Sequence, residues 1–268
     1  MTTQPHADAV GGAVGSGALC YVYALVPADT GMPEDLSGAE GNELALIRHG
    51  ELAAVVSEVS TDRPLGTRED LLAHELVVES LAKETTVLPM RFGAVVRTAE
   101  AVVDELMAPY HDWFAGVLTD LTGRAEFIIV GTYVRDEVLR EVLTEEPETL
   151  RLRDNVREMS EDAGYYDRIR LGELIVQALE GKREKDNAAL AHAVAPYAAA
   201  VAPRQPVGDD TAADVAFLVA TAERRRFEDA VEDLGRRWAG RIRLRMLGPL
   251  APYDFVPPAP EEAEAWGS

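Results

Sequence analysis

The sequence predicts an α+β protein of two domains followed by an extended tail. Apolar residues alternate with a period of two in some segments and recur at helical spacing in others, so strands and helices are mixed. Gly123 opens a second half with a different order of elements, and prolines punctuate the chain from Gly248 onward. The predicted boundaries are a disordered arm over 1–17, an N-terminal α+β domain over 18–122, a C-terminal ferredoxin-like domain over 123–247 and a tail over 248–268.

The first half follows the order β–ββ–α–β–α. The turn His49-Gly50 between two apolar segments indicates a hairpin. Thr67 is a suitable N-cap for a helix whose predicted buried face carries Leu71, His74, Val78 and Leu81. The predicted elements are strands over 18–26, 43–48 and 52–57, a helix over 67–84, a strand over 87–96, and a helix over 100–121 that Pro109 is expected to kink or break.

The second half approaches the βαββαβ order of a ferredoxin-like fold with extra helices inserted. The apolar segment Phe127–Val130 predicts a strand buried on both faces. Pro203 and Pro206 are expected to end a long helix. The predicted elements are a strand over 127–130, helices over 135–144, 148–160 and 167–194, strands over 204–207 and 214–220, a helix over 222–238 and a strand over 241–246 with its arginines on one face.

The charge of the chain limits its partners. Among 268 residues, 47 are acidic and 26 basic, which gives a net charge of −21. Phosphate backbones and anionic lipids repel such a chain, so neither nucleic acid nor a lipid membrane is an expected partner. No signal peptide is seen, and no apolar segment reaches the roughly 20 residues that span a bilayer. Cys20 is the only cysteine, so a reducing cytoplasm is the expected location.

No pattern of catalytic or metal-binding residues is found. None of the five histidines lies four residues from another, so no metal or cofactor is predicted. Neighbouring acids such as Asp104-Glu105 point about 100° apart on a helix, and no Gly-x-Ser-x-Gly segment is present. Cys20 is interpreted as a packed thiol, and the chain is not expected to be an enzyme.

Two features of the sequence leave alternatives open. His74 lies on an apolar helix face, where it either bonds to backbone in the core or makes a buried polar contact with a neighbouring strand. The run Arg224-Arg225-Arg226, with the arginines of 241–245, either pairs with the chain's own acids or docks an acidic partner.

Two segments are unusual for generic strands or loops. In the first, Val87-Leu88-Pro89-Met90-Arg91-Phe92-Gly93, the proline suits a strand start or edge, and the glycine permits a bulge or a close backbone approach. In the second, Leu247-Gly248-Pro249-Leu250-Ala251-Pro252-Tyr253-Asp254-Phe255-Val256, two X-Pro pairs predict an extended chain with apolar side chains able to lie across the domains.

Together these segments resemble the gas vesicle GvpL/GvpF family. That family has a Leu-Pro-x-Arg-Phe-Gly strand preceded by a histidine-bearing helix, a first strand of the Tyr-x-Tyr type, and a Gly-Pro-x-Pro-Pro-Tyr-x-Phe tail. Leu250 and Ala251 stand where the family usually has tryptophan and proline. The matching residues are Tyr21, Tyr23, His74, Leu88, Pro89, Met90, Arg91, Phe92, Gly93, Gly248, Pro249, Pro252, Tyr253 and Phe255.

The resemblance implies that the chain folds into two α+β domains. It also implies that the chain is a minor component or an assembly factor of gas vesicles and that it catalyses no reaction. It implies that the chain contacts the small hydrophobic shell protein and other gas vesicle accessory proteins. We therefore expect a cytoplasmic, vesicle-associated protein that binds shell protein and limits its aggregation, with an exposed strand edge as the binding mode. The alternatives are a small-ligand protein or enzyme on a ferredoxin-like sheet, and a scaffold that binds only other accessory proteins.

Overall fold

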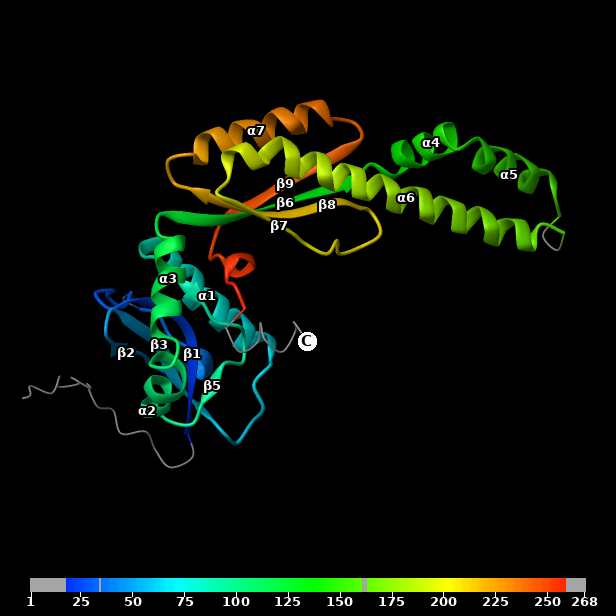
Figure 1. Ribbon diagram of the computed structural model, residues 1–268. Helices are drawn as coiled ribbons and strands as arrows, with labels where there is room; N and C mark the ends of the chain where they lie inside the picture. Colours follow the sequence, from blue (N-terminus) through cyan, green and yellow to red (C-terminus); the bar gives the residue numbers. More distant parts are fainter. Residues whose placement is uncertain (1–17, 34, 161–162, 259–268) are drawn as a thin grey trace, which may run out of the picture. The chain divides into compact units, whose positions relative to one another are not determined.

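The computed structural model describes residues 18–33, 35–160 and 163–258 (Figure 1). The disordered arm expected over 1–17 lies outside the described residues. By its internal contacts the chain divides into a terminal unit, Met1–Glu126 with Pro249–Ser268, and a central unit, Phe127–Gly248. The residues predicted to form a separate tail thus group with the terminal unit from Pro249 onward. Both units are mixtures of helices and an antiparallel sheet.

The sheet of the terminal unit is organised around strand β1. Its strand order is β2-β3-β1-β4, with β5 also paired to β1. Because β1 is central, its side chains are buried on both faces, and Tyr21 and Tyr23 are inaccessible to solvent. The strands are β1 (Ala18–Pro27), β2 (Leu44–His49), β3 (Leu52–Ser60), β4 (Leu88–Pro89) and β5 (Val95–Val96), and the helices are η1 (Ala39–Gly41), α1 (Arg68–Glu84), α2 (Ala99–Ala101), η2 (Val102–Met107), α3 (His111–Leu121) and η4 (Tyr253–Phe255).

The predicted strand over 87–96 is wrong in its middle. Only Leu88–Pro89 and Val95–Val96 pair with β1, and the residues between them form a loop. The physical cause is Gly93, whose φ of 92° lies in the left-handed region that a regular strand does not use. A turn bond from the Ala94 amide to the Arg91 carbonyl closes the loop.

The predicted helix over 100–121 is also interrupted. A short α-helical turn and a π-helical segment end at Met107, and α3 begins at His111. The break lies at Pro109, as expected, because proline cannot donate a helical hydrogen bond. On α1, the predicted buried face is correct for His74, Val78 and Leu81, but Leu71 is exposed and Val77 is buried in its place.

The start of α1 is fixed by a buried carboxylate. The Thr67 hydroxyl accepts from the Asp70 amide at 3.2 Å, and Asp70 accepts from the Thr67 amide at 3.0 Å, which together form a capping box. Arg63 donates to both Asp70 oxygens, at 2.6 and 3.0 Å. The hydrogen bonds from Arg63, added to those from Thr67 and Gly66, hold the pKa of Asp70 well below its usual range although burial opposes them.

In the central unit, a four-stranded sheet has the order β7-β8-β6-β9. Helices α6 and α7 cover one face of this sheet, and α4 and α5 pack against the part of α6 that projects past it (Figure 1). Its elements are β6 (Arg124–Tyr133), α4 (Arg135–Glu145), α5 (Pro147–Glu158), α6 (Tyr165–Val194), η3 (Ala195–Tyr197), β7 (Ala200–Pro203), β8 (Thr211–Ala220), α7 (Arg224–Arg237) and β9 (Ile242–Leu250).

Three predictions for this unit need correction. The long helix ends at Val194, its predicted last residue, but Pro196 follows this end, so Pro203 and Pro206 do not terminate it. The short strand lies at Ala200–Pro203 instead of 204–207. Phe127 and Ile129 are fully buried but Ile128 and Val130 are only partly so, so β6 alternates where burial on both faces was expected. These changes keep the predicted order of elements.

The carboxylate that starts α1 can be tested with Asp70→Asn. We expect this change to cost about 2–3 kcal/mol of unfolding free energy, because it leaves Arg63 and two backbone amides with a weaker, neutral acceptor. The measurement is urea unfolding at neutral pH. Glu69→Gln, in the same helical turn but exposed, is the matched control and should change stability by less than about 0.5 kcal/mol. Equal effects of the two changes would contradict this role for Asp70.

Candidate functional site

Three distant segments of the terminal unit meet at the imidazole of His74. His74 is 5% exposed and projects from α1 toward β1. Its Nδ1 lies 2.9 Å from the Tyr21 hydroxyl, and its Nε2 lies 3.0 Å from the Tyr253 hydroxyl. A neutral imidazole has one donor and one acceptor nitrogen, so one tyrosine donates and the other accepts. His74 therefore links the first strand, the helix and the tail. Both of the alternatives left open for His74 are present, since it contacts Tyr21 of a neighbouring strand and also bonds to the Met90 backbone.

Tyr23 extends this cluster on the same side of β1. Its ring centroid lies 4.7 Å from that of Tyr21, and its ring stacks on His74 at 5.7 Å. The Tyr23 hydroxyl lies 2.8 Å from Ser57 Oγ and accepts from the Ala39 amide at 2.6 Å. Both tyrosines face α1 because they lie two residues apart on one strand.

The loop between β4 and β5 closes over the tyrosines. The Gly93 amide donates to the Tyr21 hydroxyl at 3.1 Å, and the Met90 amide donates to the Tyr23 carbonyl at 2.9 Å. The Phe92 ring lies 6.0 Å from that of Tyr21. Leu88 and Pro89 are buried on β4, whereas Arg91 is exposed at the outside of the loop. The left-handed φ of Gly93 thus lets its amide reach Tyr21.

The tail closes the cluster from the other end of the chain. The Ala251 amide donates to Glu79 at 3.0 Å, and the Ala251 side chain is buried in the core of the unit. The Asp254 amide donates to Glu126 at 2.9 Å. Gly248, with φ of 137°, precedes this segment, and Tyr253 and Phe255 form the short helix η4.

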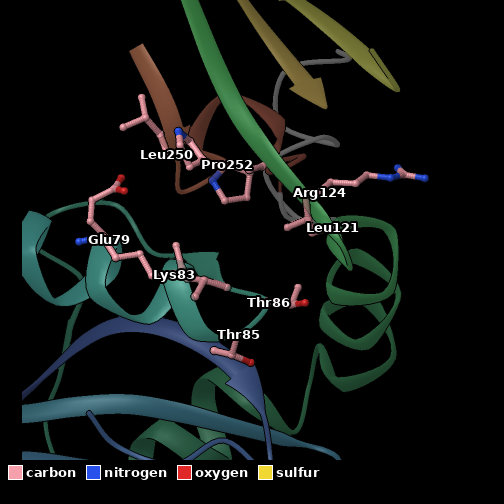
Figure 2. A pocket seen from close by; sticks show the side chains of 12 residues that line it. Glu79, Lys83, Thr85, Thr86, Leu121, Arg124, Leu250 and Pro252 are labelled. Carbon is pink, nitrogen blue, oxygen red and sulfur yellow. The ribbon is translucent and has the colours of Figure 1, made fainter. Parts of the chain in front are cut away.

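A small cleft lies beside the tail in the terminal unit (Figure 2). Leu250, one of the two tail residues that depart from the family pattern, contributes to its wall, as do Pro249 and Pro252. The other lining residues are Glu79, Ala82, Lys83, Thr85, Thr86, Val87, Leu121, Arg124 and Ala125. Acidic, basic and apolar side chains are mixed along the cleft, so its lining does not indicate one class of ligand.

The electrostatics of the cluster favour neutral groups. Burial lowers the pKa of His74, with a hydrogen bond to the Met90 backbone opposing it. Burial raises the pKa of Tyr21 to about 12 and also raises that of Tyr253. Neutral groups that satisfy one another's hydrogen bonds stabilise a buried site, so the bonds from His74 to Tyr21 and Tyr253 fix the tail to the sheet. Cys20 is buried nearby on β1, as predicted for a packed thiol, and burial raises its pKa to about 11.

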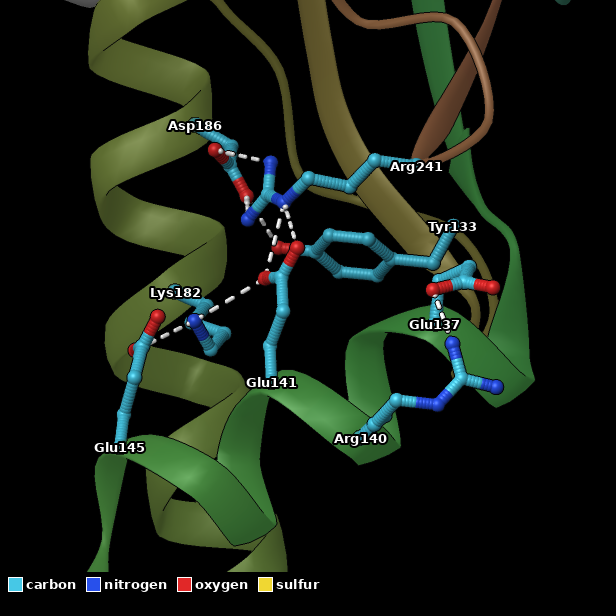
Figure 3. A network of polar contacts seen from close by, with 8 residues as sticks. All are labelled: Tyr133, Glu137, Arg140, Glu141, Glu145, Lys182, Asp186 and Arg241. Carbon is cyan, nitrogen blue, oxygen red and sulfur yellow. Dashed lines mark hydrogen bonds and ion pairs between the residues drawn. The ribbon is translucent and has the colours of Figure 1, made fainter.

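A second polar cluster lies in the central unit and is ionic (Figure 3). Arg241 forms a bidentate pair with Asp186 of α6, both bonds being 2.8 Å long. Its Nε donates to both oxygens of Glu141 of α4, at 2.7 and 2.9 Å. The Tyr133 hydroxyl donates to Asp186 at 2.7 Å, and the guanidinium lies 5.7 Å from the Tyr133 ring centroid. The pair with Asp186 raises the pKa of Arg241.

Lys182 continues this network along α6. It donates to Glu141 at 3.1 Å and to Glu145 at 2.7 Å (Figure 3). Although burial opposes them, the bonds from Arg241 and Lys182 lower the pKa of Glu141. Two cations thus join three carboxylates and fasten α4 and α6 to the start of β9.

Sequence reasoning did not find this second cluster. The alternating pattern of 241–246 predicts Arg241, Arg243 and Arg245 on one face of a strand. Arg241 instead precedes β9 and bonds to α6, whereas the other two are exposed. The one feature of the sequence that indicates this cluster is the i,i+4 spacing of Lys182 and Asp186, which places both side chains on neighbouring turns of one helix. The Arg224–Arg226 run does pair with local acids: Arg224 with Glu228, and Arg226 with Glu223.

Two classes of site are absent from the part of the chain that the structure describes. No group of three or more histidine, cysteine or acidic residues there is placed to hold a metal ion. No helix within residues 18–33, 35–160 and 163–258 is both long and apolar enough to cross a membrane.

Comparison with known proteins gives a consistent result. The family model "Gas vesicle synthesis protein GvpL/GvpF" matches residues 19–257. Gas vesicle protein F of Dolichospermum flosaquae is 24% identical, with 88% of this chain and 96% of the relative covered. Gas vesicle protein L of a Streptomyces species is 30% identical, with 91% of this chain and 95% of the relative covered. The crystal structure of GvpF from an Anabaena species has a TM-score of 0.76 at 24% identity, covering 90% of this chain and 99% of that one.

The burial of His74 predicts a pH-dependent stability. Its folded pKa lies below the ordinary value of 6.5, so the unfolded chain binds more protons as the pH falls. Stability is therefore complete above about pH 6.5 and declines below it, by less than about 1.4 kcal/mol per pH unit for one proton. Unfolding between about pH 7 and pH 5.5 should show a smaller decline in His74→Gln than in the wild type. If the unfolding free energies of both proteins fell equally between these pH values, His74 would not be the group that causes the decline.

The ionic cluster predicts a large effect of removing its central cation. Arg241→Met should cost about 3–5 kcal/mol, because Asp186 and Glu141 are left partly buried without their main partner. The control is Arg140→Met, which removes an exposed pair with Glu137 and should cost about 0–1 kcal/mol. Chemical denaturation of both variants gives the comparison. A loss at Arg241 no larger than at Arg140 would show that the cluster does not stabilise the central unit.

Proposed function

This chain belongs to the GvpL/GvpF family of gas vesicle synthesis proteins, and on that premise we propose that it binds the hydrophobic shell protein and limits its aggregation during vesicle assembly. The family match over residues 19–257 carries the proposal, since it places the chain among gas vesicle accessory proteins. The net charge of −21 supports it, because a highly charged companion keeps an apolar partner in solution.

Strand β2 supplies the surface for this binding. It lies at the edge of the terminal sheet, and among the described strands it pairs only with β3. The outer side of an edge strand presents backbone donors and acceptors that can pair with a strand of another chain. Ile47 and Leu46 are only partly buried on it, so apolar side chains accompany the free backbone edge.

We also propose that the central unit is a ferredoxin-like domain. Its strands follow the sequence order β6, β7, β8, β9 and the spatial order β7-β8-β6-β9, with α6 and α7 on one face. Numbered within the unit, this is 2-3-1-4, the arrangement that a βαββαβ chain adopts. Helices α4 and α5 then form an insertion before the first crossover helix.

Co-expression of this chain with shell protein tests the proposed function. The wild type should retain shell protein in the soluble fraction and co-purify with it. Ile47→Lys, which places a charge on the β2 edge, should lower the captured amount severalfold, because edge charges block strand pairing. Leu72→Lys, a similar change at an exposed position of α1, is the control and should capture as the wild type does.

Two outcomes would overturn the proposal in different ways. Capture of other accessory proteins without shell protein would indicate a scaffold. Capture of shell protein that is equal for the wild type and Ile47→Lys would retain the function but remove the β2 edge as its surface.

A further inference from the structure

The N-terminal half of α6 carries an apolar stripe that no element of the described residues covers. Tyr165, Ile169 and Val176 are 59%, 46% and 56% exposed, and Gly172 has open space where a side chain would lie. Their spacing of four, three and four residues places them within an arc of about 60° on one helix face. This is the spacing of a helix-pairing seam.

The same face of α6 is buried further along the helix. Leu179 packs partly against the core, and Leu190 and Val194 are inaccessible to solvent. The C-terminal half of α6 packs on β8, whereas its N-terminal half projects past the sheet (Figure 1). Helices α4 and α5 contact α6 elsewhere, so they leave the stripe from Tyr165 to Val176 uncovered.

We infer that this stripe pairs with the same stripe of a second copy of the chain, with the two α6 helices antiparallel. Charge favours this occupant. Residues 163–182 carry three basic and three acidic side chains, whereas the whole chain carries −21. The stripe thus lies on a neutral segment where two otherwise repelling copies can approach.

Shape favours the antiparallel direction. A two-fold axis between residues 170 and 171 places Ile169 opposite Gly172 of the second copy, so that a large residue faces a space. It also places Tyr165 opposite Val176 of the second copy. A parallel arrangement would place Gly172 opposite its own equivalent. It would also direct the second helix toward the sheet that occupies this side of α6 beyond Leu179.

The flanking residues are compatible with this pairing. Tyr166, which is 82% exposed, lies at nearly the height of Glu173 of the second copy, where a hydroxyl can donate to a carboxylate. The paired segment is about 18 Å long at 1.5 Å per residue. Such a contact is smaller than a standard stable interface, so the association is weak and depends on concentration.

Sedimentation of the full chain over a concentration series reaching several hundred micromolar tests the pairing. The wild type should approach the mass of a dimer, and more readily at higher salt, which screens the net charge. Ile169→Glu should remain monomeric. Val207→Glu, which changes an 87% exposed residue outside the stripe, is the matched control and should dimerise like the wild type. A folded wild type that stays monomeric throughout, or an Ile169→Glu that dimerises, would overturn the inference.

Cysteine cross-linking tests the direction independently, because the single native thiol, Cys20, is buried. Chains carrying Tyr165→Cys and chains carrying Val176→Cys should cross-link when mixed and should not cross-link alone. Cross-linking of either variant with itself would indicate parallel helices. Dimers that form with no cross-link in any combination would place the interface elsewhere.

Discussion

The terminal unit depends on one buried imidazole that bonds to two tyrosines. His74 lies 53 residues from Tyr21 and 179 residues from Tyr253 in sequence, yet each of its nitrogens has one of these hydroxyls as a partner. The contact holds the central strand, the helix above it and the returning tail in one arrangement. The Gly93 loop adds a fourth segment through the same Tyr21 oxygen. Loss of any partner leaves a buried polar group without a hydrogen bond, which is costly in a site closed to water.

The two units use different chemistry for the same task of joining distant segments. The terminal unit uses neutral aromatic groups, whose pKa values burial shifts away from ionisation. The central unit uses Arg241 and Lys182 between three carboxylates, at the point where α4, α6 and β9 meet. A partly buried ion cluster gives little net stability over an apolar one, but its geometry is specific, and removing the central cation is costly. This specificity suits the base of a helix that projects beyond its sheet.

Local signals in the sequence predicted most elements, and contacts between distant residues account for the errors. The Thr67 cap, the hairpin at Gly50, the break at Pro109 and the long α6 follow from neighbouring residues, and all are present. A glycine at position 93 permits the split of the strand, but the bond from its amide to Tyr21, 72 residues away, forms only in the fold and cannot be predicted from neighbouring residues. The Arg241 cluster was missed because its partners lie 55 and 100 residues away. The family motif identified the residues around His74 but not their mutual bonds, which only the fold brings together.

The family-motif residues around His74 join β1, α1 and the tail of the terminal unit, and we propose that the exposed surfaces at β2 and α6 bind partners. A double-mutant cycle with Tyr21→Phe and Tyr253→Phe tests this central claim most directly. Because both hydroxyls share one imidazole, their effects on unfolding free energy should be non-additive by about 0.5–3 kcal/mol. Additive effects would show that the two tyrosines act independently, and that the imidazole does not link the tail to the first strand.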